Sequence, residues 1–457
     1  MPSPSNVRVI IVGGGIGGLS LANMFEKAGI SYIILEKATR IRALGSSLGL
    51  DASSLPVMEQ LGLLPDFYRV SSPVRHFNFY NDNVKSIGMI DFSDLEEIGG
   101  YPAIILDRPS FYNILLKNIP RNRILYNKRV LSITQDEDGA TARCADGSAY
   151  LGDVIVGADG AYSAVRQNIY KSLKQKGKLS SNDDKPLGYN QHCLVGVSRP
   201  LDPEEYTCLK RNFTDFEIVI PKSDPFYAVY MPLPNNRISW AVIQNVEKGD
   251  AQTGEGFRFS EWGPEATMEM ANFVRHQPNP FNGGTLGDII DNTPRDLITK
   301  IMLEEKFFEA WHEDRVVLLG DACHKVVPSA GLGANLAVLE AVHLCNLLVD
   351  MPTVSLKDIT SVFEVYYEQR GTIAKAALSK SRQFGKAMGD RGPVSQFVRK
   401  VFFNHIPDWM TRLSNTQRIQ YRPQLHFLPQ APERGTVKGK PQEPRLFGAP
   451  FKDAVPV

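Results

Sequence analysis

Short apolar runs, each ending at a glycine or an acid, recur at four places along the chain. They cover residues 8–12, 31–35, 154–157 and 315–319, and are rich in Val, Ile and Leu. Runs of this length and composition are typical of parallel strands that are buried on both faces. The intervening segments have helical spacing, so the pattern predicts a parallel α/β sheet.

The first two runs enclose a glycine-rich turn and a helix. Gly13, Gly15 and Gly18 occupy the positions of a GxGxxG pattern, residues 19–28 have helical spacing, and the second run ends at Glu36. Such a unit places a pyrophosphate at the helix N-terminus, while the terminal acid accepts a hydrogen bond from a ribose hydroxyl. The alternative is a tight structural turn, but the strand, helix and acid together favour dinucleotide binding.

The middle of the chain has a different pattern, with strands separated by turn residues. Residues 76–80 and 85–92 predict a hairpin, and 124–133 and 140–145 predict further strands. Between 187 and 244 the pattern becomes antiparallel, with a helix at 264–276 beyond it. The expected strands there are 193–197, 216–220, 226–231 and 237–243. Residues 171–185 predict a polar surface insertion. Residues 40–50, which include Gly49, predict either a plain loop or backbone that passes close to a ligand.

The last third predicts helices at 334–349, 356–388 and 393–413, followed by a proline-rich extended tail. Within 397–410, Val398, Phe402, Ile406 and Trp409 recur at helical spacing. Core packing and weak membrane docking both explain that stripe. The short polar segment before the first strand is no secretory signal, and no stretch reaches the about twenty apolar residues of a membrane span.

Composition narrows the classes of function. The chain has 457 residues, 43% of them hydrophobic, and a formal net charge of +1, so it has no electrostatic footprint for nucleic acid. Its five cysteines are scattered and have no metal-ligand spacing, which predicts reduced thiols in a soluble, cytoplasmic protein. His324 beside Asp321 resembles a metal ligand, but no second ligand accompanies it, so we expect a hydrogen-bonded loop histidine and no metal.

Three separated motifs resemble those of the class A FAD-dependent monooxygenases, a family that includes para-hydroxybenzoate and salicylate hydroxylases and a fungal epoxidase and hydroxylase branch similar to the paxilline-type enzymes. The glycine pattern with Glu36 is the first. Residues 157–166 (GADGAYSAVR) are the second, and residues 320–335, from Gly320-Asp321 to Asn335, are the third. Two positions depart from the family pattern: Cys323 replaces the usual alanine, and Lys325 the usual proline.

The resemblance implies a cofactor and its ligands. FAD would be bound by Gly13, Gly15, Gly18, Glu36, Gly49, Arg108, Asp159, Asp321, Gly333, Ala334 and Asn335. Glu36 would serve the adenosine ribose and Asp321 the ribityl chain. The helix that starts near Gly333 would direct its N-terminus at the flavin, where the reduced ring becomes anionic. Only one GxGxxG unit is present, so NAD(P)H would bind transiently and the reduced flavin would react with O2 to form a C4a-hydroperoxide.

The implied architecture is an α/β fold: a Rossmann-like FAD-binding domain with an inserted antiparallel β-sheet substrate domain and C-terminal helices. The expected FAD-binding domain is discontinuous, comprising 1–74, 102–185 and 286–352. The substrate domain takes 75–101 and 186–285, the helical region 353–415, and the extended tail 416–457.

The implied function is epoxidation or hydroxylation of a hydrophobic polyketide, terpenoid or aromatic intermediate. An FAD-dependent dehydrogenase or cyclase, and a non-catalytic binding protein on the same fold, are the alternatives. On the antiparallel sheet, His192 lies near a position where some relatives carry arginine, and Tyr230, or Tyr227 on the opposite face, near the usual tyrosine. Because the charge of histidine depends on pH, His192 favours a neutral substrate over a phenolate.

Overall fold

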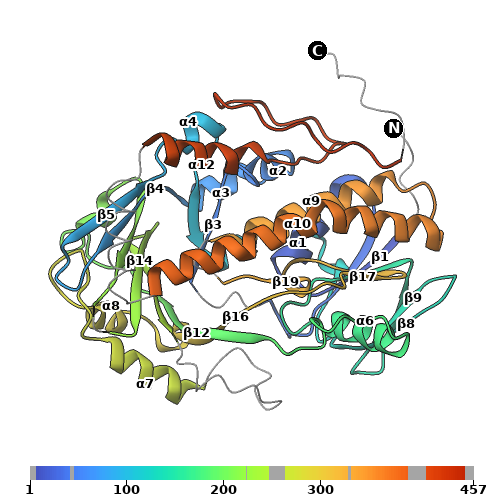
Figure 1. Cartoon of the computed structure of the whole chain (residues 1–457), viewed down its shortest axis with the longest axis horizontal. Coiled ribbons are helices and arrows are strands. Elements are labelled where there is room, and N and C mark those ends of the chain that lie inside the picture. Colours follow the sequence, from blue (N-terminus) through green and yellow to red (C-terminus); the bar gives the residue numbers. More distant parts are fainter. Residues whose placement is uncertain are drawn as a thin grey trace.

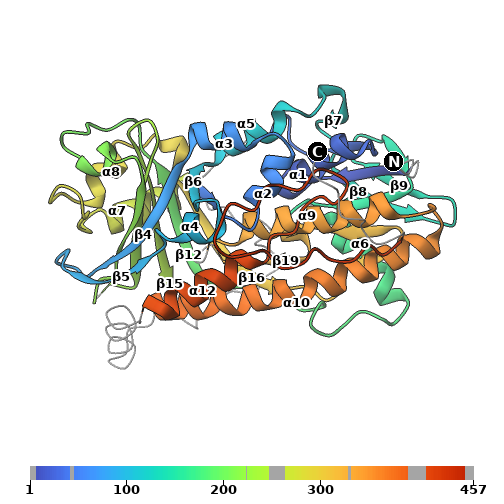
Figure 2. The ribbon, with the colours of Figure 1, turned by 90° about the horizontal axis from the view of Figure 1, so that it is seen from above.

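A computed structural model describes residues 7–41, 46–222, 224–245, 263–327, 331–389 and 408–447. Two large sheets lie side by side along the long axis, with helices around and between them (Figures 1 and 2). The first sheet is formed by the apolar runs of the sequence, and the second by the middle of the chain. The predicted α/β fold with an inserted antiparallel sheet is confirmed.

The first sheet has six strands in the order β17-β18-β11-β1-β2-β7. Its parallel strands are β1 (Arg8–Val12), β2 (Ser31–Leu35), β7 (Ile124–Leu125), β11 (Val154–Gly157) and β18 (Val316–Leu318), and β17 (His312–Glu313) pairs antiparallel at the edge. Helices α1 (Ile16–Ala28) and α9 (Gly333–Asp350) pack against each other. All four apolar runs therefore become neighbouring strands, and their carboxyl ends meet at one edge, where α/β sheets bind ligands.

A small antiparallel sheet consists of β8 (Val130–Gln135), β9 (Ala140–Cys144) and β10 (Ala149–Gly152). The single strand predicted at 124–133 is wrong, because the chain forms β7 and β8 in two different sheets. Asn127, between them, has a φ of +59° and turns the chain from one sheet to the other.

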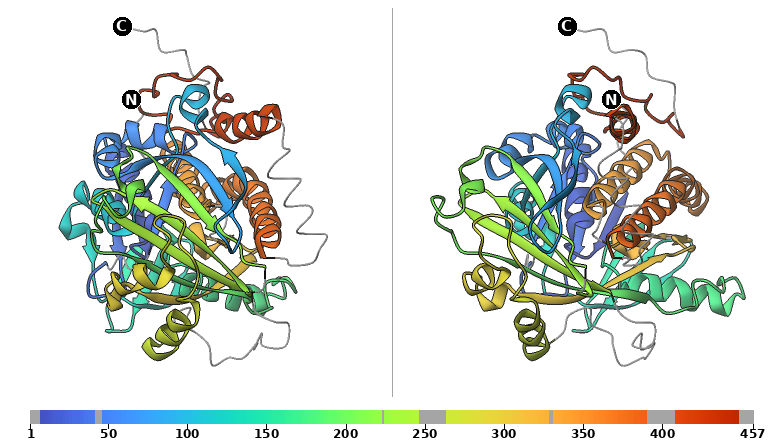
Figure 3. Two further views of the ribbon diagram at one scale, coloured as in Figure 1. Left: turned by 90° about the vertical axis from the view of Figure 1, so that its left-hand side faces the viewer. Right: turned by 60° about the vertical axis from the view of Figure 1, so that its left-hand side comes forward.

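The second large sheet has ten strands. Its main order is β19-β16-β12-β15-β14-β13-β4-β6-β3, and β5 pairs with β4. The strands are β3 (Ser47–Leu50), β4 (Ser72–Tyr80), β5 (Ser86–Asp91), β6 (Ile104–Asp107), β12 (Gly188–Val197), β13 (Thr214–Val219), β14 (Phe226–Leu233), β15 (Arg237–Asn245), β16 (Thr299–Phe307) and β19 (His324–Lys325). Figure 3 views the molecule from the end where most of these strands lie. Residues 47–50 form strand β3, although a plain loop was one of the two expectations for residues 40–50. Strand β16 was not predicted.

Helices surround the two sheets. The shorter ones are α2 (Leu55–Gln60), α3 (Leu64–Val70), α4 (Leu95–Gly99), α5 (Arg108–Lys117), α6 (Ala164–Gln175), α7 (Pro264–Val274), α8 (Leu286–Asp291) and α12 (Asp408–Gln420). The long helix α10 (Leu356–Gly389) extends from beside α9 to the ten-stranded sheet (Figures 1 and 2). Among the described helices, α9 alone has the length and composition of a membrane span, and 72% of its 18-residue window is buried inside the protein.

The predicted boundary of the extended tail at 416 is wrong, since α12 continues to Gln420. The predicted surface insertion at 171–185 also begins inside a helix, because α6 runs to Gln175. Most of the stripe at 397–410 lies outside the described residues. Trp409 is described, at the start of α12, and is 65% exposed.

The tail beyond α12 runs back over the N-terminal half of the fold, beside α2, α4 and α12 (Figure 1). Arg434 forms an ion pair with Glu59 of α2, and Arg422 Nη1 donates to the Gly99 carbonyl at 3.0 Å. Arg445 Nε donates to both carboxylate oxygens of Asp350 at 3.0 Å. The tail is therefore fixed along its length by charged contacts with helices far away in sequence.

Candidate cofactor site and the sheet that faces it

The glycine-rich turn after β1 is closed tightly against the second motif. Gly13 has a φ of +107°, and a Cβ there would lie 2.5 Å from the Ala158 carbonyl oxygen. A Cβ on Gly18 would lie 2.2 Å from the Gly13 carbonyl oxygen. Gly15 is the N-cap residue of α1 and has more room. Only glycine fits the first and third positions, which is the packing that the GxGxxG spacing predicts.

Glu36 follows β2 and lies beside this turn. Its carboxylate accepts hydrogen bonds from the Gly14 N–H at 2.7 Å and the Ala38 N–H at 2.8 Å. Those two donors hold the side chain at the carboxyl edge of the sheet, next to the N-terminus of α1. A carboxylate has about four acceptor sites, so it keeps capacity for a ribose hydroxyl.

The second motif begins α6 and reaches across to the third. Asp159 accepts from the Ala164 N–H at 2.7 Å, at the first residue of α6, whose N-cap is Ser163. Burial raises the pKa of Asp159. Arg166 is buried, lies 3.7 Å above the ring of Phe308, and donates from Nη1 to the Ala322 carbonyl at 2.8 Å. Arg166 therefore connects the second motif to the Asp321 loop, which here means residues 320–327.

Asp321 lies on this loop beside a cation that the family pattern does not predict. Lys325 Nζ forms an ion pair with Asp321 Oδ2 at 2.5 Å, and their side chains are 28% and 39% exposed. Burial alone would raise the pKa of Asp321, but Lys325, His324 and Arg108 together lower it below its usual value. Asp321 is therefore an ionised acceptor, and Arg108, at the start of α5, is close enough to stabilise its charge.

Behind the loop lies a buried polar group that the sequence did not reveal. Glu340 of α9 accepts from the Gly320 N–H at 2.8 Å and contacts His324 Nε2, while Cys323 Sγ lies 3.2 Å from the Gly320 carbonyl oxygen. All three side chains are fully buried. The expectation that His324 has no companion ligand is wrong, because Cys323 and Glu340 lie beside it. Both Glu340 oxygens already accept hydrogen bonds, so the arrangement supports the loop by hydrogen bonding.

The start of α9 meets β3 at the same place. Gly333 and Ala334 form its first turn, and Asn335 donates from Nδ2 to the Gly49 carbonyl at 3.3 Å and accepts from Ser54 Oγ at 2.5 Å. Gly49 itself lies close to the neighbouring strand, since a Cβ there would lie 3.1 Å from the Ile104 carbonyl oxygen. Asn335 therefore joins the third motif to the ten-stranded sheet.

Helices α1 and α9 begin at the candidate cofactor site, and neither carries a side-chain cap. Side-chain caps are also missing from α2, α3, α4 and α7, so α1 and α9 are distinguished by their position and not by the missing cap. The first N–H groups of an uncapped helix attract an anion. Two such N-termini, with Glu36 and Asp321 as acceptors, form a donor and acceptor set that FAD would satisfy.

The two faces of the ten-stranded sheet have different neighbours. Helices α7 and α8 cover one face, and its buried cluster includes Tyr230 and Trp240. On the other face Tyr227, Ile218 and Ile243 form a cluster with Val327, which ends the Asp321 loop, and with Met388 of α10. That second face, which we call the loop-facing side, is the one directed at the candidate cofactor site.

His192 and Tyr230 both lie on the helix-covered face. Tyr230 is fully buried, and its hydroxyl donates to the Pro278 carbonyl at 3.3 Å. Side chains alternate along a strand, so His192 shares the face of Leu194, which belongs to the same cluster as Tyr230. The structure does not bring these two residues to Asp321. It places Tyr227, the alternative that the sequence left open, on the loop-facing side.

A second buried network lies between α9, α10 and the tail. His343 Nδ1 is 2.7 Å from Gln369 Oε1, and its Nε2 is 2.7 Å from the Tyr421 hydroxyl. Burial lowers the pKa of His343 to about 3, and the nearby Arg370 guanidinium adds to this effect. His343 is therefore neutral, with Nδ1 as donor to Gln369 and Nε2 as acceptor from Tyr421.

The comparisons with known proteins agree with this geometry. Residues 6–184 and 289–381 match the family described as an FAD binding domain. The chain is 30% identical over 436 residues to the FAD-dependent monooxygenase prhF of Penicillium brasilianum, covering 92% of this chain and 88% of that protein. It is 28% identical over 444 residues to the FAD-dependent monooxygenase atmM of Aspergillus flavus, covering 92% and 87%.

Solved structures share the fold. Klebsiella pneumoniae HpxO complexed with FAD and uric acid superposes with a TM-score of 0.72 at 18% identity, covering 90% of this chain and 96% of that one. A salicylate hydroxylase substrate complex gives a TM-score of 0.65 at 18% identity, covering 91% and 98%. The matched family, the curated relatives and the three converging motifs lead to one conclusion: this chain belongs to the class A FAD-dependent monooxygenases.

Proposed function

We propose that this protein is an NAD(P)H-using FAD monooxygenase that inserts one oxygen atom of O2 into a neutral, hydrophobic natural-product intermediate by epoxidation or hydroxylation. The second oxygen atom leaves as water, and NAD(P)H supplies the two electrons. The relatives named FAD-dependent monooxygenases support the reaction class, since they align over most of the chain.

The observation that carries the substrate class is the composition of the loop-facing side. Val195, Ile218, Tyr227 and Ile243 are buried there in one cluster with Val327 at the end of the Asp321 loop. Burial of an apolar surface is favourable, at about 25 cal/mol per Å² removed from water, and discriminates against charged groups. A substrate held between this face and the loop would therefore be apolar.

The side chains at the cofactor site have separate tasks. FAD, when bound, accepts hydride from NAD(P)H and activates oxygen. Glu36 would accept a hydrogen bond from the ribose, and ionised Asp321 would accept one from the ribityl chain. The uncapped N-termini of α1 and α9 offer N–H groups and a positive dipole end to negative charge. The loop-facing side excludes water, and Tyr227 gives it a phenol that can orient a polar group of the substrate.

Isotope incorporation separates the monooxygenase from its alternatives. Deletion of the gene in the producing organism should cause the intermediate to accumulate, and that compound is then incubated with purified protein, NADPH and oxygen-18 gas. We expect a product that carries one heavy oxygen atom, with none incorporated from oxygen-18 water under ordinary oxygen.

Two other results would refute the proposal in different ways. A product without heavy oxygen, formed with consumption of O2, indicates a dehydrogenase or cyclase. A colourless purified protein that does not take up FAD when the cofactor is supplied indicates a binding protein on the same fold. FAD uptake is measured from the flavin absorbance, so the test for a non-catalytic binding protein requires no substrate.

A further inference from the structure

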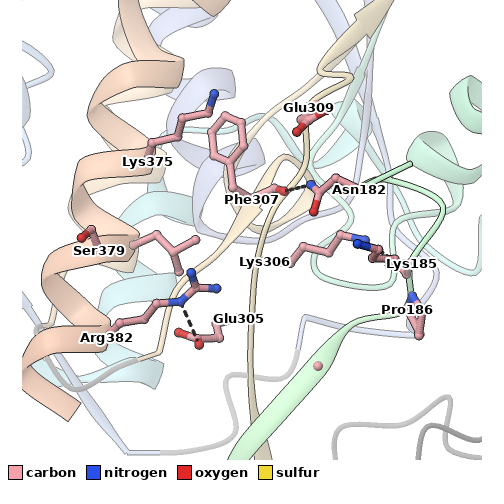
Figure 4. Close-up of a pocket in the computed structure, with 12 residues that line it drawn as sticks. Asn182, Lys185, Pro186, Glu305, Lys306, Phe307, Glu309, Lys375, Ser379 and Arg382 are labelled. Carbon is pink, nitrogen blue, oxygen red and sulfur yellow. Dashed lines mark hydrogen bonds and ion pairs between the residues drawn. The ribbon is translucent and has the colours of Figure 1, made fainter. Parts of the chain in front are cut away.

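A cavity of about 470 Å³ lies outside the cofactor site and the loop-facing side of the sheet. It opens between α10, β16 and the chain that connects α6 to β12 (Figure 4). Its volume is within the range of small-molecule sites, about 300–1,000 Å³. Nothing in the cofactor chemistry described above uses it.

Cations dominate the lining. Lys185, Lys306, Lys375 and Arg382 contribute positive charge, against the carboxylates of Glu305 and Glu309. Figure 4 shows Lys375 and Arg382 directed from α10 toward the cavity, with the opposing loop on the other side. An excess of cations over acids in a concave site attracts an anionic ligand.

The individual contacts show which cations can serve a ligand. Lys306 is buried and donates to the Asp183 carbonyl at 3.3 Å, so it holds the opposing loop in place. Arg382 Nε forms an ion pair with Glu305 at 2.9 Å, and a guanidinium has five N–H donors in all. Lys375 Nζ lies 4.7 Å from the centre of the Phe307 ring. The Phe307 ring itself is buried and packs against Trp311. Lys375 and Arg382 therefore have donors to offer to an anionic ligand.

The cavity is one strand away from the Asp321 loop. Lys306 of β16 is paired in register with Lys325 of β19, and Lys325 forms the ion pair with Asp321. On the same strand, Glu304 contacts the Tyr162 hydroxyl of the second motif. Neighbouring strands lie about 5 Å apart, so a ligand here would lie beside the cofactor site without occupying it.

We propose that this cavity binds the adenosine end of NADPH, with Lys375 and Arg382 contacting its 2′-phosphate. A phosphate is an anion that a guanidinium and an ammonium both bind well. The proposal rests on the proposed function, which requires a reductant. It goes further by selecting NADPH over NADH, because NADH lacks the 2′-phosphate.

The test uses fragments that bind without turnover. Calorimetric titration of the FAD-loaded protein with 2′,5′-ADP and with 5′-AMP separates the 2′-phosphate from the rest of the nucleotide, and inorganic phosphate serves as the third probe. We expect 2′,5′-ADP to bind at least tenfold more tightly than 5′-AMP, since only 2′,5′-ADP carries the phosphate that the two cations would contact. The preference should diminish as salt is added.

Variants then locate the site. Lys375→Ala and Arg382→Ala should each weaken 2′,5′-ADP about tenfold and raise the KM for NADPH, with the KM for NADH and the FAD content unchanged. Arg382→Lys should restore part of the affinity. Lys380→Ala is the matched control, because Lys380 is an exposed lysine on α10 that does not line the cavity.

Three results would overturn the proposal: equal affinity for 2′,5′-ADP and 5′-AMP, a preference that survives both alanine variants, or binding of inorganic phosphate as tight as that of the nucleotide. A variant that loses both 2′,5′-ADP binding and its FAD content would be unfolded. In that case Arg382→Lys, with normal FAD content, decides whether the Arg382 side chain binds the nucleotide. None of these measurements depends on oxygenation. A protein that binds 2′,5′-ADP at this site but incorporates no oxygen refutes the proposed function alone.

Discussion

Replacement of Glu340 tests whether the buried group behind the Asp321 loop determines the stability of the cofactor site. Glu340→Ala leaves two buried donors, the Gly320 N–H and His324, without their acceptor. Each unpaired buried donor costs about 1–3 kcal/mol. With two such donors, we expect the free energy of unfolding to fall by about 2–6 kcal/mol.

Glu340→Gln separates the hydrogen bond from the charge. Its single carbonyl oxygen can accept from the Gly320 N–H or from His324, but not from both, so about half of the loss should remain. Glu368, an exposed acid of α10, gives the control, and Glu368→Ala should change the free energy by less than about 0.5 kcal/mol.

The assay is urea unfolding monitored by tryptophan fluorescence. Trp311 is well placed as a reporter, because its ring centre lies 5.7 Å from that of His324. Flavin fluorescence provides a second readout: FAD should bind more weakly to both Glu340 variants, since Gly320 positions Asp321. An unchanged unfolding midpoint for Glu340→Ala, or a smaller loss for alanine than for glutamine, would refute the reasoning.

The other predictions concern FAD, the substrate face and pH. Asp321→Ala should lower flavin occupancy by removing an acceptor, which would weaken binding by a few kcal/mol; flavin absorbance per protein measures it. Tyr227→Phe should increase hydrogen peroxide release relative to product, whereas His192→Ala and Tyr230→Phe should keep normal coupling. His343 has a folded pKa of about 3, below its unfolded value of 6.5, so its contribution is complete above pH 6.5 and is lost as pH falls toward 3. Between pH 7 and 5, His343→Gln should therefore lose about 2 kcal/mol less stability than the wild type, as measured by urea unfolding.

A specific result would contradict each of these predictions. Equal flavin occupancy in Asp321→Ala and wild type would remove Asp321 from the cofactor set. If Tyr230→Phe uncouples turnover and Tyr227→Phe does not, the helix-covered face is the functional one. Parallel stability curves for His343→Gln and wild type between pH 7 and 5 would mean that His343 does not titrate as proposed.

The sequence predicted the features that depend on neighbours in the chain. The Gly13 turn and Glu36 belong to one local unit, so spacing alone placed them beside the helix N-terminus. Glu340 was not predicted, because nothing within its apolar helix indicates that it meets Gly320, twenty residues away. The pairing of Asp107 with Arg237, at 2.7 Å, likewise joins residues that only the fold brings together.

The ten-stranded sheet shows a second limit. The alternation of side chains along a strand correctly placed Tyr227 and Tyr230 on opposite faces of the sheet. It does not show which of the two faces is directed at the cofactor site. That choice depends on α7 and α8, which cover the face of Tyr230. Strand β16 was missed because its sequence, TKIMLEEKF, mixes charged and apolar positions without a regular period of two.

The tail has a consequence for the order of events during biosynthesis. Arg434 and Glu59 are separated by 375 positions. Almost the whole chain must therefore be synthesised before Glu59 of α2 can pair with Arg434. Closing so long a loop is slow because its entropy is lost before any contact compensates for it. During synthesis Glu59 and the Gly99 carbonyl therefore lack these partners until the chain has been made beyond residue 434, and docking of the tail is a late step. A protein released before this step would retain its glycine-rich turn yet be open to proteolysis around α2 and α4.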